Sequence, residues 1–206
     1  TRYWRDWSSD VCSSDLATPG AALPLASDHL ALLIDLSGSV SRVLADGRTR
    51  RELIDAAVLA TLAASAPGTR LQLVPFTATP QPIPERPEAL SPRLARRWSQ
   101  EFTDLRPRGP GDLWEAIEET LVHRELDTLV VLTDGVPTGG FHAEPRVFVE
   151  QLLPGLRLDP VAVDLVLVDA GPSLRRRWEP LTQRTGGELS LRSFPEPSAA
   201  RDGQRR

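Results

Sequence analysis

Three oxygen-bearing side chains follow one short apolar run in this sequence, and their types suit a divalent cation. Asp35, Ser37 and Ser39 form the pattern D-x-S-x-S, and Gly38 between the two serines allows a tight turn. Hard cations such as Mg²⁺ or Mn²⁺ prefer oxygen ligands, and Mg²⁺ combines few carboxylates with neutral oxygens and retained waters. The pattern therefore predicts a metal site, although a polar turn between a strand and a helix would use the same residue types.

A second aspartate ends a later apolar run. Asp134 follows the run Thr128 to Leu132 within the tripeptide Thr-Asp-Gly. If both runs are parallel strands on either side of the switch in strand order, their carboxyl ends are neighbours, where doubly wound sheets bind ligands. Asp134 would then reach the same ion as Asp35, directly or through water. Thr133 is more simply explained as a β-branched strand residue.

Stretches of helical periodicity alternate with short apolar runs typical of buried strands. Strands are predicted at residues 30–34, 70–76, 128–132, 161–168 and 188–191, and helices at about 49–66, 91–105, 112–121, 144–156 and 173–184. Residues 77–87 contain too many prolines for a central strand, so they form at most an edge strand. This alternation predicts an α/β fold: a doubly wound, Rossmann-like, mostly parallel central sheet with helices on both faces.

Composition narrows the possible functions. The 206 residues suit one domain with tails, and 40% apolar with 25% charged residues is ordinary for a globular protein. The net charge of −4 gives no basic surface for nucleic acid or an anionic membrane. No apolar run approaches the roughly 20 residues of a membrane span.

The two ends of the chain differ from its middle. Residues 1–16 lack apolar periodicity and resemble translated sequencing-adapter sequence, so we expect them, with Cys12, to be non-native. The sequence predicts a linker at residues 17–28, the domain at residues 29–194 and a flexible tail at residues 195–206. All 24 basic residues are arginine and no methionine occurs, which favours a fragment of a larger protein from a GC-rich genome.

The segments LLIDLSGSVS and VVLTDG resemble the von Willebrand factor type A (vWA) domain with its metal-ion-dependent adhesion site. The resemblance covers about Leu30 to Phe194 and includes LQLVPF, RGPGDLWEAIEETL and LTQRTGGEL. The continuation TDGVPTGG is similar to bacterial members. The resemblance implies that Asp35, Ser37, Ser39 and Asp134 bind one Mg²⁺, and that an acidic side chain of a protein partner completes its coordination.

One residue of that pattern is missing. Family members usually have a threonine ligand before an Asp or Asn, whereas this chain reads Gly109-Pro110-Gly111-Asp112, with Gly111 at the threonine position. The site could therefore be weak or lost. Asp112 is explained by capping a helix with Glu115 at the third helical position, and it could also lie just behind the metal ligands.

The sequence thus favours a protein-interaction module with a Mg²⁺-dependent face and no catalytic activity. One alternative is a vWA scaffold that works without metal, which Gly111 favours. A less favoured alternative is Mg²⁺-dependent phosphoryl transfer with Asp35 as nucleophile, because such enzymes need a second carboxylate two residues later, where this chain has Ser37. The compartment is not determined, although the resemblance favours an extracytoplasmic or membrane-anchored protein.

Overall fold

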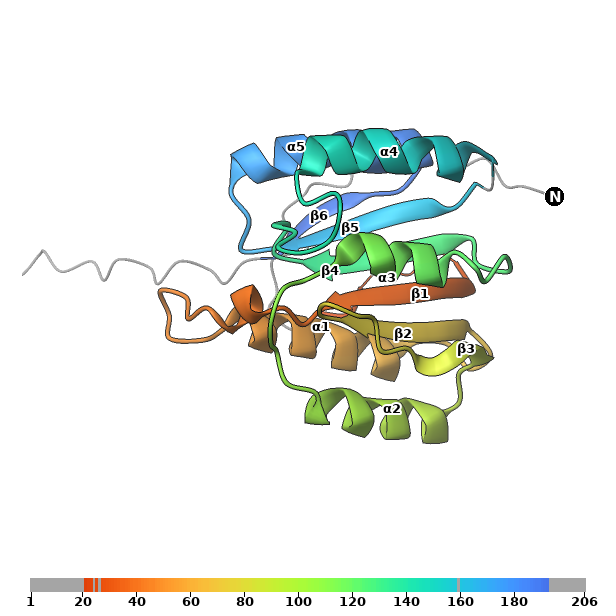
Figure 1. Cartoon of the computed structure of the whole chain (residues 1–206). Helices are drawn as coiled ribbons and strands as arrows, with labels where there is room; N and C mark the ends of the chain where they lie inside the picture. The colour runs from red at the N-terminus through yellow and green to blue at the C-terminus, as the bar shows by residue number, and fades with distance from the viewer. Residues whose placement is uncertain (1–20, 24, 26, 159, 193–206) are drawn as a thin grey trace, which may run out of the picture.

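One mixed sheet forms the centre of the molecule in the computed structural model, which describes residues 21–23, 25, 27–158 and 160–192. The strand order is β3-β2-β1-β4-β5-β6, and every pairing is parallel except that of β3 with β2 (Figure 1). The strands are β1 (His29–Asp35), β2 (Arg70–Phe76), β3 (Ile83–Ala89), β4 (Thr128–Thr133), β5 (Ala162–Val168) and β6 (Leu189–Arg192). The predicted doubly wound α/β fold, with β1 beside β4, is confirmed.

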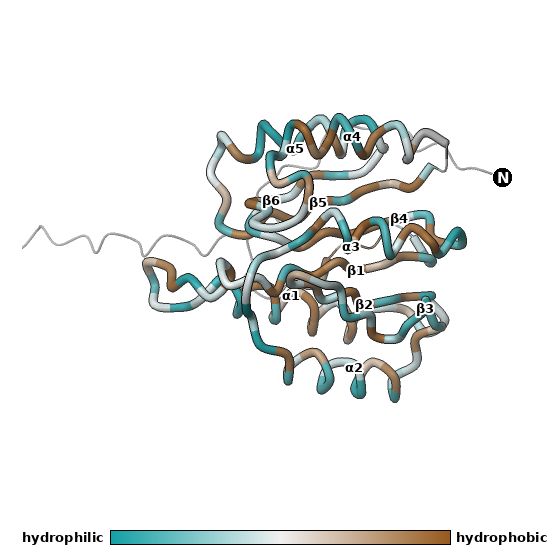
Figure 2. Tube along the Cα trace, in the orientation of Figure 1, coloured by the Kyte–Doolittle hydropathy of each residue, from teal (hydrophilic) through white to brown (hydrophobic). Residues whose placement is uncertain are grey.

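Helices cover both faces of the sheet (Figure 1). They are η2, a short 3₁₀ helix (Gly38–Ser41), and the α-helices α1 (Arg50–Ala64), α2 (Pro92–Asp104), α3 (Leu113–Thr120), α4 (Pro145–Leu158) and α5 (Pro172–Thr185). Helices α1 and α2 pack into one apolar cluster, and α3, α4 and α5 into the other. Strand β1 contributes Leu30, Leu32 and Ile34 to the first and alternate residues to the second, as expected for a strand buried on both faces. The central strands are accordingly hydrophobic, whereas α2 alternates hydrophobic with hydrophilic residues (Figure 2).

Local capping chemistry fixes where several helices begin. Thr49 and Glu52 form a capping box at the start of α1, with the Thr49 side chain accepting from the Glu52 amide. Ser91 caps α2 ahead of a first-turn proline. Helix α5 contains Pro180 and still continues to Thr185, with Trp178, Leu181 and Thr182 buried around the proline.

The folded core extends upstream of residue 29, where the sequence indicated a linker. Leu23 is buried, and its amide donates to the Thr61 hydroxyl on α1 at 2.9 Å. Arg192, the last residue of β6, donates to the carbonyls of Ala21 and Ala22. Leu25 is partly buried against the same cluster, and packing by two such leucines has no periodic signal that a sequence pattern could reveal. The predicted non-native segment 1–16 and tail 195–206 lie outside the described residues.

The sequence predicted at most an edge strand in this proline-rich region, and strand β3 does lie at the edge of the sheet. It contains Pro84 and Pro87, and the Gln72 side chain on β2 donates to the carbonyls of Pro84 and Glu85. The edge position suits residues that have no N–H to donate. Among the described residues, no helix combines the length and apolar character required to cross a bilayer.

Candidate metal centre

Two buried carboxylates stand at the carboxyl ends of the neighbouring strands β1 and β4. Asp35 ends β1 and is 3% exposed, and Asp134 directly follows β4 and is 2% exposed. Burial raises the pKa of Asp35, and the negative charge of Asp134 raises it further, whereas hydrogen bonds from Thr133 and Ser37 oppose these effects. Two buried carboxylates at neighbouring strand ends favour the binding of a cation, because a buried negative charge requires a compensating positive charge.

Hydrogen bonds fix the orientation of the Asp35 carboxylate. The Ser37 amide donates to Oδ1 at 2.8 Å, and the Thr133 hydroxyl donates to Oδ2 at 2.7 Å. Thr133 Oγ1 also accepts from the Gly135 amide at 3.0 Å, so this side chain joins β1 to the loop after β4. Its β-branched type explained its place in a strand but not this contact. Each Asp35 oxygen keeps a second lone pair for another partner.

The two serine hydroxyls lie side by side. Ser37 is the N-cap of η2, Ser39 lies within it, and their Oγ atoms are 2.8 Å apart. Adjacent ligands of an octahedral Mg²⁺ ion with bonds of about 2.1 Å are separated by about 3 Å, so this spacing suits one ion. The donor set of two hydroxyls and a carboxylate is also the hard-oxygen chemistry that Mg²⁺ and Mn²⁺ prefer. The residues therefore fit such an ion.

Gly111 faces the same oxygen atoms. The loop before α3 is attached to the end of β1, because the Gly38 amide donates to the Gly109 carbonyl and the Arg108 amide donates to the Leu36 carbonyl, both at 2.9 Å. A Cβ atom built on Gly111 would lie 3.4 Å from both Asp35 Oδ1 and Ser37 Oγ. A side chain at position 111 would thus begin at the edge of the oxygen cluster.

Asp112 caps α3, as its spacing to Glu115 predicted. Its Oδ1 accepts from the Glu115 amide at 3.0 Å, and its own amide donates to the Thr77 carbonyl at 2.8 Å. The carboxylate also abuts Gly140, which has a φ of +82°. These contacts direct Asp112 to α3 and the loop after β4.

Arg50, which no sequence pattern singled out, binds Asp134. Its Nη1 donates to Asp134 Oδ2 at 2.7 Å, while its Nε and Nη2 donate to Asp169 Oδ2 at 3.1 and 3.0 Å. The Arg50 side chain is 11% exposed. Asp134 Oδ1 accepts from the Val136 amide at 3.1 Å. A permanent positive charge is therefore already held at one of the four predicted ligands.

The loop after β4 supports both sides of the site. The Thr138 hydroxyl accepts from the Gly111 amide at 2.8 Å, and the Gly111 carbonyl accepts from the amides of Thr138 and Gly139. At the other end of this loop, Trp178 on α5 donates its Nε1–H to the Gly135 carbonyl at 2.9 Å.

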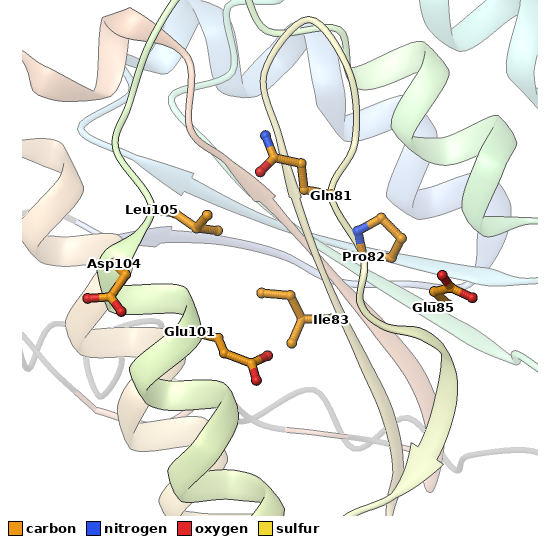
Figure 3. A pocket seen from close by; sticks show the side chains of 7 residues that line it. All are labelled: Gln81, Pro82, Ile83, Glu85, Glu101, Asp104 and Leu105. Atoms are coloured by element: carbon orange, nitrogen blue, oxygen red, sulfur yellow. The ribbon is translucent and has the colours of Figure 1, made fainter.

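A surface depression of about 510 Å³ lies elsewhere, between β3 and α2 (Figure 3). It is lined by Gln81, Pro82, Ile83, Glu85, Glu101, Asp104 and Leu105. None of the predicted site residues lines this depression. It is therefore separate from the oxygen cluster.

No family model matches this sequence, and neither does any curated protein. Solved structures do match. A von Willebrand factor type A protein from Catenulispora acidiphila has a TM-score of 0.63 and 13% identity over 80% of this chain, which spans 38% of that protein's length. The SpRpn10 VWA domain has a TM-score of 0.55 and 12% identity, covering 85% of this chain and 89% of that one.

A third match is an aerotolerance-related membrane protein from Bacteroides fragilis. Its TM-score is 0.55 and its identity 12%, covering 79% of this chain and 90% of that one. Sequence identities this low support a shared backbone arrangement, but they are no evidence of shared ligands or partners. Together with the strand order and the two helical layers, these likenesses show that the chain has a vWA-like fold.

Proposed function

We propose that this domain is a protein-interaction module that binds its partner through a Mg²⁺ or Mn²⁺ ion held beside the end of β1. The observation that carries the proposal is that the Asp35 carboxylate and the Ser37 hydroxyl both lie 3.4 Å from the Cβ position of residue 111, while the Oγ atoms of Ser37 and Ser39 are 2.8 Å apart. Asp134 is the fourth proposed ligand, directly or through water. Gly111 leaves the place of a fifth protein ligand to water, which Mg²⁺ accepts at little geometric cost.

The ion would supply a fixed positive charge with exchangeable coordination positions at the surface. A carboxylate is the partner group that such a position favours, because Mg²⁺ binds hard anionic oxygen. We therefore propose that an acidic side chain of a protein partner completes the coordination. As the sequence resemblance implies, we expect this to happen outside the cytoplasm or on a membrane-anchored parent protein.

We propose no catalytic role for Asp35. Phosphoryl transfer through an aspartyl nucleophile needs a general acid nearby, and the residue two positions later, Ser37, is a neutral hydroxyl bonded to Ser39. Both Asp35 oxygens also accept hydrogen bonds that fix the carboxylate in place. These contacts suit a ligand held ready for an ion.

The test is the response of the purified domain to metal. After removal of divalent ions with EDTA, we expect Mg²⁺ or Mn²⁺ to raise the melting temperature and to give a calorimetric binding heat, because an ion that binds only the native state stabilises it. Asp35→Ala should abolish both signals. Asp46→Ala, which removes an exposed carboxylate from the loop before α1, is the matched control and should leave both unchanged.

A second candidate is a vWA scaffold that binds its partner without metal. It is supported by Gly111 in place of a threonine and by the Arg50–Asp134 ion pair, which supplies a cation from the chain itself. A folded domain with no thermal shift and no binding heat at millimolar Mg²⁺ or Mn²⁺ would favour this candidate over the first.

A further inference from the structure

Arg50 links the carboxylates that follow two neighbouring strands. Asp134 follows β4 and Asp169 follows β5, and the guanidinium donates to Oδ2 of both. The side chain of Asp134 is 1% exposed, whereas that of Asp169 is 38% exposed. The buried end of this arrangement lies at the proposed metal site, and the other end reaches solvent.

A buried carboxylate needs a counter-charge, and here the chain provides one. Removing one partner from a buried ion pair leaves an uncompensated charge, which is strongly destabilising. Arg50 therefore stabilises Asp134 when no ion is bound. The same guanidinium opposes an incoming cation in two ways: it occupies Asp134 Oδ2, and its positive charge repels the ion.

Arg50 would keep a partner if it left Asp134. Two of its donors, Nε and Nη2, already bind Asp169 and do not depend on Asp134. Only the Nη1 contact of 2.7 Å would have to break. The partly exposed Asp169 would therefore keep the Arg50 guanidinium paired while Asp134 binds the ion.

We propose that Arg50 is an internal cation that competes with the divalent ion for Asp134 and lowers the metal affinity of the site. The Arg50–Asp134 ion pair and a bond from Asp134 to the ion exclude each other, and Asp169 sets the balance by holding the displaced guanidinium. This inference rests on the proposed metal site. It concerns the Arg50–Asp134 ion pair and is independent of the missing threonine at Gly111.

The test compares Mg²⁺ and Mn²⁺ affinity, measured by calorimetry, in the wild type, Arg50→Gln and Asp169→Asn. Removing the competing charge should tighten binding by about tenfold in Arg50→Gln. Asp169→Asn should weaken binding, because the guanidinium then depends on Asp134 alone. Asn is chosen because residue 169 has a φ of +53°, which asparagine tolerates. Arg97→Gln, which breaks an exposed ion pair with Glu101 on α2, is the charge-matched control and should change affinity less than twofold.

Melting temperatures in EDTA give a second measurement that needs no bound metal. Arg50→Gln should melt below the wild type, because Asp134 is left buried and unpaired, and the rise on adding Mg²⁺ should be larger than in the wild type. If Arg50→Gln does not fold, Asp169→Asn still tests the proposal by its opposite sign.

The outcomes separate this inference from the function on which it rests. Equal affinities in wild type, Arg50→Gln and Asp169→Asn would overturn the role of Arg50 while leaving the metal site in place. Binding by Arg50→Gln alone would support the role of Arg50 and show that the wild type favours its own cation. Absence of binding in every variant would overturn both the metal site and the competition.

Discussion

Gly111 lies directly against Asp35: a Cβ atom on the glycine would stand 3.4 Å from Oδ1 of the carboxylate. Residues from the loop before α3 and from the end of β1 therefore meet at one point. The position of Gly111 also requires no positive φ, unlike that of Gly109 at +61°. A side chain is thus compatible with the backbone at 111, which makes the missing threonine open to experiment.

Gly111→Thr should tighten Mg²⁺ binding by about tenfold, because it adds a hydroxyl ligand beside the existing oxygens. The new Cβ would lie 3.0 Å from the Ser37 Cβ, so Ser37 must shift by a few tenths of an ångström. Gly111→Val has the same shape without the hydroxyl and is the control. Calorimetry on both variants measures the difference, and equal affinities would mean that residue 111 does not face the ion.

Thr133→Val should both destabilise the domain and weaken metal binding. The change removes the hydroxyl that donates to Asp35 Oδ2 and accepts from the Gly135 amide, and leaving buried groups unpaired costs about 1–3 kcal/mol. Thr128→Val, at the opposite end of the same strand, is the isosteric control for metal binding. Urea denaturation and calorimetry check the two effects. Unchanged affinity in Thr133→Val would show that the hydroxyl does not position Asp35.

Without metal, Asp35 should make the domain less stable as pH rises. Burial raises the pKa of its carboxyl above the ordinary value of 3.8, so the folded state keeps a proton that the unfolded state has lost. The free energy of unfolding therefore falls as pH rises from about 3.8 through the folded pKa, and levels off above it.

Asp35→Asn removes this titration. Its stability relative to the wild type should therefore increase across the same pH window and become constant above it. Urea denaturation in EDTA, at intervals between about pH 4 and pH 8, measures the difference. A gap between variant and wild type that is the same at every pH would contradict the raised pKa.

Trp178→Phe should cost more stability than Trp98→Phe, although both indoles are fully buried. Trp178 donates to the Gly135 carbonyl, and its removal leaves that oxygen unpaired. No acceptor for Trp98 Nε1 is found within the part of the chain that the structure describes, so its loss removes volume without breaking a bond. We expect a difference of at least about 1 kcal/mol by chemical denaturation. Equal costs would show that the bond to Gly135 adds nothing.

Most of the fold could be predicted from the sequence because its signals are local. The capping box of Thr49 with Glu52 spans four residues, and the apolar run before Asp35 is continuous, so each element could be recognised from its own stretch of chain. The predicted neighbours β1 and β4 followed from the general rule for doubly wound sheets.

The contacts that were missed join distant parts of the chain. Arg50 is 84 residues from Asp134 and 119 from Asp169, and Trp178 is 43 residues from Gly135. In the sequence, an arginine near the start of a helix has the pattern of an ordinary surface residue. Only the folded structure shows that the carboxylates after β4 and β5 lie within its reach. The same holds for Leu23, whose burial depends on where α1 lies.

The prolines of β3 affect how this domain behaves when many copies of it lie close together. An exposed sheet edge is a template for a strand from another molecule, which is a route to aggregation. Pro84 and Pro87 cannot donate to such a strand, and the neighbouring Glu85 and Glu88 place charge along the same edge. We therefore expect the β3 side of the sheet to resist edge-to-edge growth at high local concentration, as on a crowded surface or in a tandem array.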